Sequence, residues 1–217
     1  MFANLTGAEM KTAFEEIVKS KMDDTLFYQV LALAKAEIEM ERPWQILQEL
    51  DTSQTIGASH VYTTAKTLPT RFLTPISIFV GDDRVQYIQI PFSERERYQD
   101  TAHRWYLKRK DSTFFICGKP ESGKTINFFF VKSSVDISST TTWEFPDWAH
   151  LLLPIKAAKL HYPIDTGEKG RSWDDRWLVQ ENRIRRALLM WDARMAKEAN
   201  RHSKRGIDYS SHPNIVG

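Results

Sequence analysis

The sequence predicts an α+β protein in which helices from both ends of the chain form a bundle around an inserted antiparallel β-meander, with an extended C-terminal tail. Apolar residues recur at helical spacing before residue 50 and again after residue 143. Between these regions, short aromatic and β-branched runs alternate with turn residues, as in strands joined by loops. We therefore expect a helical bundle of residues 1–50 and 143–200, a β-rich insertion at 51–142 and a C-terminal arm at 201–217.

Two amphipathic helices are expected before the insertion. Thr6 and Glu9 have the spacing of a capping box, which predicts a helix start at this point. Asp23 is the expected cap of a second helix, whose wide apolar face continues to about Glu41. Pro43 ends that helix, because proline has no backbone N–H and disfavours a helical residue before it.

Five strands are expected in the insertion, after a Thr- and Ser-rich loop at 51–75 that has one short strand near Val61. The linkers between these strands are too short for parallel crossovers, which need about a dozen residues or more. The sheet is therefore predicted to be an antiparallel meander. The expected strands are 76–80, 85–90, 105–109, 113–117 and 126–132.

Two further helices are expected after the insertion. Pro146 suits the first turn of a helix that continues to about Leu160. Ser172 is the expected cap of a final helix at 173–200, which carries Trp, Ile and Leu along one side. Its opposite side is either a solvated basic face or a contact for an acidic partner or a DNA backbone. The basic side chains are Arg176, Arg183, Arg186, Arg194 and Lys197.

Composition limits the class of protein. The chain has 217 residues, 41% of them hydrophobic, so it can bury a sizeable core. The net charge of +2 is too small to indicate nucleic-acid binding by itself. Cys117 is the single cysteine, which excludes an internal disulfide, and we expect it to be a buried, inert thiol. The absence of a long apolar run or a signal-peptide pattern predicts a soluble intracellular protein with no membrane contact.

The stretch Gly118–Thr125 (GKPESGKT) fits the phosphate-loop pattern G-x-x-x-x-G-K-[ST]. A working phosphate loop needs a helix directly after it, because the helix N-terminus supplies amides and a positive dipole end. The aromatic and β-branched residues 126–131 predict a strand instead. We therefore favour a solvent-exposed hairpin turn, and a P-loop nucleotide-binding protein that uses residues 118–125 remains the alternative.

No enzyme chemistry is predicted. No two histidines stand at metal-ligand spacing on one helix, so neither a metal nor a cofactor is expected. The paired acids Asp23-Asp24 and Asp174-Asp175 are explained by capping of helix starts. Ser122 lacks the glycine elbow of a hydrolase nucleophile, so no catalytic residue is assigned.

The order of these elements resembles a known family. A helix pair closes on Pro43-Trp44, Leu68–Phe72 leads into the strand at 76, Phe145–Trp148 opens a helix, and a Trp- and Arg-rich helix follows. Over roughly residues 5–200 this layout resembles the head-to-tail adaptor (connector) proteins of tailed bacteriophages. Another scaffold or interaction protein with the same layout is the further alternative.

The resemblance implies a structural virion protein in the neck between capsid and tail, assembled in the host cytoplasm. Such adaptors form a ring of usually twelve copies that docks under the portal protein, offers a platform to the tail or the next connector, and lets double-stranded DNA pass. In the family the C-terminal segment often reaches the portal or a neighbouring subunit. The tail, which is otherwise expected to be disordered, would then supply interface residues: Arg201, Lys204, Arg205, Tyr209, Ile215 and Val216.

GKPESGKT is not a motif of the family. Within the resemblance it is a hairpin tip that faces the channel or the tail. Its charged residues, of which the lysines would face DNA, are Lys119, Glu121 and Lys124.

Overall fold

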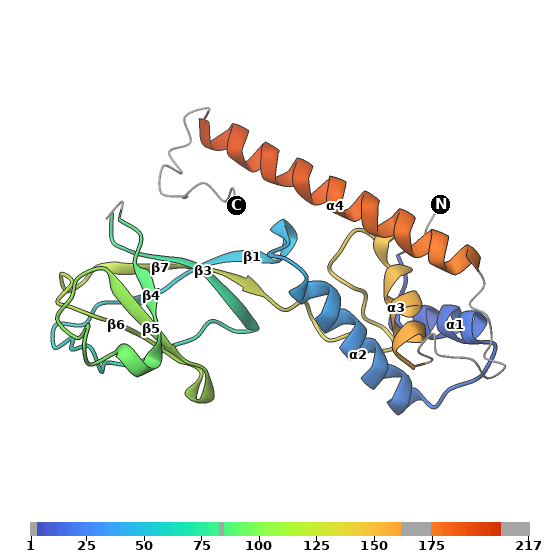
Figure 1. The fold of residues 1–217 in the computed structure, drawn as a ribbon, viewed down its shortest axis with the longest axis horizontal. Coiled ribbons are helices and arrows are strands. Elements are labelled where there is room, and N and C mark those ends of the chain that lie inside the picture. The colour runs from blue at the N-terminus through green and yellow to red at the C-terminus, as the bar shows by residue number, and fades with distance from the viewer. Residues whose placement is uncertain (1–3, 83–84, 162–174, 205–217) are drawn as a thin grey trace. The chain divides into compact units, whose positions relative to one another are not determined.

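The computed structural model describes residues 4–82, 85–161 and 175–204 (Figure 1). The protein is α+β, as predicted. Its described residues divide into a helical unit, formed by Met1–Ile46 with Ser133–Asn200, and a β unit that comprises Leu47–Lys132. The β unit begins at Leu47 rather than at the predicted residue 51, and the helical unit resumes at Ser133 rather than at the predicted residue 143. None of the described helices combines the length and the apolar character that a membrane crossing requires.

The first two helices begin at the predicted caps. In α1 (Gly7–Val18) the Glu9 backbone N–H donates to Thr6 Oγ1 at 3.4 Å, and the Thr6 N–H donates to the Glu9 carboxylate at 2.8 Å. In α2 (Asp24–Met40) the Asp23 carboxylate accepts hydrogen bonds from the first-turn amides of Thr25 and Leu26. Each cap satisfies amides that have no partner inside the helix, which sets the start of the helix locally.

The core of the helical unit is aromatic and aliphatic. The helix α3 (Leu152–His161) packs against both α1 and α2. Trp143 and Phe145 stack with their ring centroids 4.0 Å apart, and Trp44 meets Phe145 edge-on. The helix α4 (Asp175–Lys204) buries the side chains of Ile184 and Leu188.

The β unit holds two sheets and is not the predicted meander. The first has the strand order β1–β7–β3 and the second the order β2–β6–β5–β4. The strands of the first sheet are β1 (Gln48–Thr55), β3 (Phe72–Val80) and β7 (Thr125–Lys132). Those of the second are β2 (Lys66–Thr67), β4 (Ile88–Ile90), β5 (Arg104–Lys108) and β6 (Thr113–Ile116).

Two features of this topology correct the prediction. The strands β4 and β5 pair in parallel, because the segment between Ile90 and Arg104 is long enough for a crossover. The strands β6 and β7, expected to form a hairpin, belong to different sheets.

The first half of the insertion is also more ordered than expected. The predicted loop at 51–75 contains most of β1, all of β2 and the start of β3, whereas Val61 lies outside these strands. The strand β1 begins at Gln48, inside the range expected to be helical.

The two sheets share one hydrophobic core. Alternate residues Ile126, Phe128 and Phe130 of β7 point into it, as the period of two in a strand requires. Trp105 of β5 and Phe114 of β6 meet them from the second sheet. Burial on this shared face explains why β6 and β7 separate into two layers, since each sheet covers the apolar side of the other.

Candidate interaction sites

The GKPESGKT segment is a connection between the two sheets, not a hairpin tip and not a phosphate loop. The strand β6 precedes it, as predicted, but β7 begins at Thr125 itself, so a strand stands where a phosphate loop needs a helix. Without a helix N-terminus, the segment lacks the convergent amides and the dipole that hold phosphates.

The backbone of this segment is used for structure. The N–H of Gly118 donates to the carbonyl of Gln99 at 2.8 Å, and the N–H of Gly123 donates to the carbonyl of Ile56 at 2.8 Å. The carbonyl of Lys124 in turn accepts the Ile56 amide at 2.9 Å. Both glycines have positive φ, +73° and +81°, which glycine adopts without a steric penalty. The motif's glycines therefore shape a packed turn, and their amides are not available to a nucleotide.

The charged residues of the segment carry both signs. The Lys124 ammonium lies 3.5 Å from the Glu121 carboxylate, and Lys119 is exposed. They line an open hollow of about 350 Å³ whose wall also includes Asp82 and His103. Because two carboxylates stand among the lysines, the hollow is not complementary to a phosphate group.

Cys117, at the edge of this segment, is fully buried, as predicted. Burial raises the pKa of its thiol, which keeps the sulfur protonated and unreactive.

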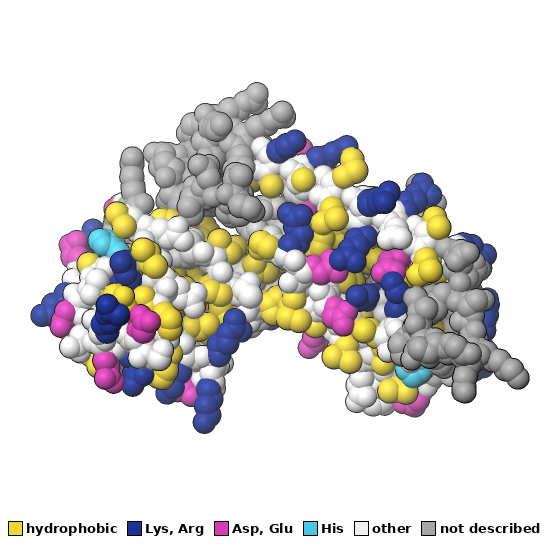
Figure 2. All heavy atoms as spheres, in the orientation of Figure 1, with side chains coloured by type: hydrophobic (Ala, Val, Ile, Leu, Met, Phe, Trp, Pro, Cys, Tyr) yellow, Lys and Arg dark blue, Asp and Glu magenta, His cyan; other side chains and the backbone are white. Residues whose placement is uncertain are grey.

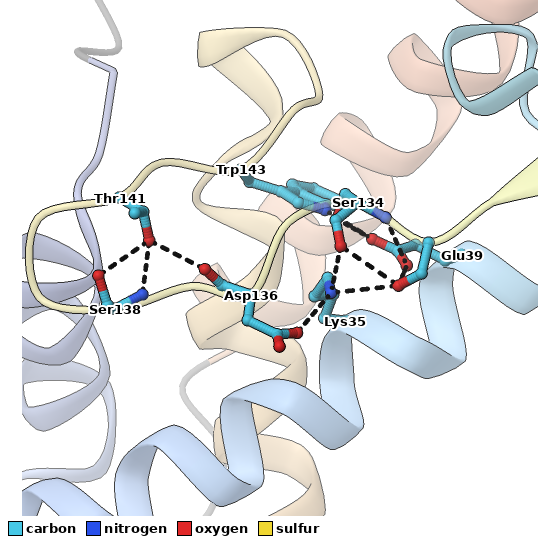
Figure 3. A network of polar contacts seen from close by, with 8 residues as sticks. Lys35, Glu39, Ser134, Asp136, Ser138, Thr141 and Trp143 are labelled. Carbon is cyan, nitrogen blue, oxygen red and sulfur yellow. Dashed lines mark hydrogen bonds and ion pairs between the residues drawn. The ribbon is translucent and has the colours of Figure 1, made fainter. Parts of the chain in front are cut away.

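A buried polar network ties α2 to the segment that returns from the β unit (Figure 3). Glu39 accepts hydrogen bonds from the Ser133 hydroxyl at 3.1 Å, from the Ser134 hydroxyl and backbone N–H, and from Trp143 Nε1 at 3.2 Å. Lys35, one turn earlier, donates to the Ser134 carbonyl at 2.8 Å. Lys35, Glu39, Ser134 and Trp143 are all buried, so each polar atom needs the partner that it has here.

Sequence reasoning missed this network. No role is predicted for Lys35 or Glu39, and Ser133 and Ser134 are included in the predicted β-rich insertion. The available signal was their position beside Leu31, Ala34 and Ile38, on the apolar face of α2. A Lys–Glu pair at i, i+4 on an apolar face indicates a buried polar contact.

Ion pairs attach α4 to the rest of the helical unit. The fully buried Asp192 accepts the Gln45 N–H at 2.7 Å and lies 2.9 Å from the Arg42 guanidinium. Glu181 lies 2.7 Å from Lys159 of α3. The Pro43-Trp44 turn, which the resemblance singled out, is thus the place where α4 is held.

The outward face of α4 carries the predicted basic side chains, and all of them are exposed (Figure 2). Figure 2 shows dark blue Lys and Arg side chains along this helix with hydrophobic side chains between them. Arg183, Arg186, Arg194 and Lys197 form no ion pair with any residue that the structure describes. The face is therefore available to a partner.

The predicted arm lies mostly outside the described residues. The helix α4 continues through Lys204, so the first residues of the arm are helical, although the side chains of Arg201 and Lys204 are not described. The other expected interface residues also lie outside the described part: Arg205, Tyr209, Ile215 and Val216.

The family model for the SU10 adaptor protein matches residues 5–217, which is nearly the whole chain. The chain belongs to the SU10 adaptor protein family. No curated protein sequence matches it. The resemblance to phage head-to-tail adaptors is thereby confirmed, and the adaptor has a structural role in a phage. The match extends over both units and through the residues after α4, so the family relationship concerns the entire layout.

Proposed function

We propose that this adaptor forms a ring in the virion neck, docks under the portal protein, provides a platform for the tail and lets double-stranded DNA pass. The observation that carries the proposal is the family match across residues 5–217. We propose twelve copies, the number that the resemblance implies for a ring that matches the portal. Such a ring needs head-to-tail contacts, in which two different surfaces of one subunit meet the neighbours on either side.

The composition of the exposed surface supports this role. The outward face of α4 combines arginines with Met190, and interfaces between proteins are enriched in both residue types. Arginine also forms the best-defined contacts with carboxylates, because its planar fork donates two parallel hydrogen bonds.

We further propose that residues 201–217, which are the last turn of α4 and the segment after it, form the arm that reaches the portal or a neighbouring copy. Its contact residues would be Arg201, Lys204, Arg205, Tyr209, Ile215 and Val216. A polar segment with a few apolar anchors binds by ordering on a preformed surface. We place the inter-sheet loop toward the channel or the tail, where Lys119, Glu121 and Lys124 would line it, with the lysines facing DNA.

The test is native mass spectrometry of the adaptor co-expressed with the portal protein of the same genome. We expect a complex with as many copies of adaptor as of portal. Two non-interacting species would refute the adaptor function.

A second sample ends at Lys204, so that α4 stays complete while residues 205–217 are removed. We expect this chain to keep the circular-dichroism spectrum and melting temperature of the full chain but to lose portal binding. Normal docking of the shortened chain would refute the arm and leave the ring proposal standing.

A further inference from the structure

The helix α2 exposes an apolar seam. Leu26, Leu33 and Met40 recur every seven residues and are 43%, 61% and 62% exposed. At about 100° per residue, this seam lies roughly 140° around the helix from the buried face. Seven-residue spacing of apolar side chains is the pattern by which one helix packs along another. The structure describes no segment that covers the seam.

The helix α4 exposes a second seam with the same periodicity. Its members are spaced by three, four or seven residues, which keeps them on one side of the helix: Val179, Arg183, Arg186, Met190 and Lys197. Val179 and Met190 are 65% and 60% exposed. This seam lies roughly 150° around the helix from the buried Ile184 and Leu188, so it points away from the rest of the helical unit.

The two seams are complementary in charge. The exposed charged side chains of α2 are the acidic residues Asp24 and Glu37, since Lys35 and Glu39 are buried. The outward face of α4 exposes basic side chains: Arg183, Arg186, Arg194 and Lys197. Glu37 lies beside the α2 seam, 2.8 Å from the Lys156 ammonium, and its side chain is 46% exposed. Long arginine side chains cover apolar surface with their stems while the guanidinium reaches a carboxylate. Arg183 and Arg186 can therefore cover Leu33 and Met40 and approach Glu37.

The seams also agree in length. From Leu26 to Met40 the α2 seam extends about 21 Å, and from Val179 to Lys197 the α4 seam extends about 27 Å, at 1.5 Å per residue. An α2–α4 contact suits the charges better than a contact between identical helices, because α4 against α4 would oppose arginines and α2 against α2 would leave the arginines of α4 without carboxylates. The two seams lie on different helices of one unit, so a single subunit carries both of the surfaces that a head-to-tail contact requires.

We propose that α2 of one copy docks on the outward face of α4 of the next, and that this contact joins neighbouring subunits of the ring. The inference rests on the proposed ring function and names its subunit interface. In this proposal the basic face of α4 binds a second copy of this chain. A demonstration that the face binds phosphates of DNA instead would refute the proposal.

The experiment uses two full-length variants, each of which disables one seam. The first carries Leu33→Asp and Met40→Asp, and the second carries Arg183→Glu and Arg186→Glu. Each variant is co-expressed with the portal protein, and the mass of the resulting complex is measured by native mass spectrometry. We expect neither to form the wild-type ring. Mixed without portal, the two variants retain one intact pair of seams and should yield 1:1 heterodimers that grow no further.

Matched controls lie on the β unit. Val61→Asp with Ile88→Asp replaces two apolar residues of similar exposure, and Arg109→Glu with Lys110→Glu makes the same change in net charge. We expect both controls to form the wild-type ring. Circular dichroism of every variant excludes loss of fold as the cause.

The outcomes separate the two proposals. If the wild type forms a ring and either seam variant forms it equally well, this interface is wrong while the adaptor function stands. Homodimers of the α2 variant would also overturn it. If the second variant keeps its ring but loses affinity for duplex DNA, the α4 face binds phosphates instead. If the wild type forms no ring with or without portal, the proposed function fails and the interface falls with it.

Discussion

Replacing Glu39 by Gln should destabilise the helical unit strongly, although the two side chains have nearly the same size. The carboxylate of Glu39 accepts four hydrogen bonds, two from serine hydroxyls and two from N–H groups that can only donate. One oxygen accepts from the Ser134 hydroxyl and Trp143 Nε1, and the other accepts from the Ser133 hydroxyl and the Ser134 N–H. A glutamine keeps one oxygen and turns an NH₂ group toward the other two donors. In either orientation, the serine hydroxyl that faces the NH₂ group can rotate to accept from it, but the indole or backbone N–H cannot, so one hydrogen bond is lost and one buried N–H has no acceptor.

The expected loss follows from these contacts. A hydrogen bond to a charged acceptor contributes about 1.5–3 kcal/mol, and donors left buried without an acceptor add a desolvation cost. One of the four bonds is long, at 3.4 Å, so we take the lower end of the range, about 1.5 kcal/mol, for the lost bond and about the same for the N–H left without an acceptor. The substitution also removes a negative charge close to the buried Lys35. We expect the free energy of unfolding to fall by about 3 kcal/mol, or the melting temperature by about 6–12 °C.

Urea denaturation followed by circular dichroism at 222 nm measures this change. Glu37→Gln is the matched control, because Glu37 lies on the same helix but is 46% exposed in its pair with Lys156. An exposed ion pair contributes about 0.5 kcal/mol or less. If Glu39→Gln destabilises the protein by no more than Glu37→Gln does, the network does not hold the returning segment on α2.

The remaining predictions concern the β unit. Gly118→Ala should lower the free energy of unfolding by about 1–3 kcal/mol, because φ is +73° and the added Cβ would lie 3.1 Å from the Thr101 carbonyl oxygen. The control is Gly57→Ala, whose added Cβ meets no atom within 4 Å and which should leave the melting curve unchanged. Burial lowers the pKa of His60, so the unfolded chain binds its proton more readily than the folded chain, and stability should fall as the pH drops below about 6.5. In His60→Asn the urea midpoint should therefore change less between about pH 7.5 and 5.5 than it does in the wild type. If the midpoint of the variant falls as much as that of the wild type, other groups cause the pH dependence. Calorimetry with Mg²⁺ and ATP should show no binding by the wild type and no change in Lys124→Ala; heat that saturates in the wild type and disappears in the variant would restore the nucleotide-binding interpretation.

The helix starts could be predicted from the sequence because capping is local. Thr6 with Glu9, and Asp23 with the two amides after it, need only a few neighbouring residues to form their hydrogen bonds. The same holds for strand identity in the most apolar runs, such as 126–132 in β7. The family could also be recognised in the sequence, since its layout is a sequence of such local elements.

Strand pairing could not be predicted in the same way. The pairing of β1 with β7 joins residues 70 or more positions apart. The strand β6 does not pair with β7 but packs against it from the second sheet, in the core that the two sheets share. Strand preference reports only that a run fits a half-buried pleated surface, not which strand lies beside it. The parallel pair β4–β5 is not predicted, because the segment between Ile90 and Arg104 is counted in the sequence among the linkers that are too short for a crossover.

The candidate sites divide along the same line. The sequence alone determined the helix caps, the strand character after Thr125 that excludes a phosphate loop, and the basic side of the last helix, because each depends on neighbours within a few residues. Only the tertiary structure decided that Glu39 is enclosed by Ser134 and Trp143, about 100 residues away along the chain, since burial and hydrogen-bond partners depend on which distant segments pack together.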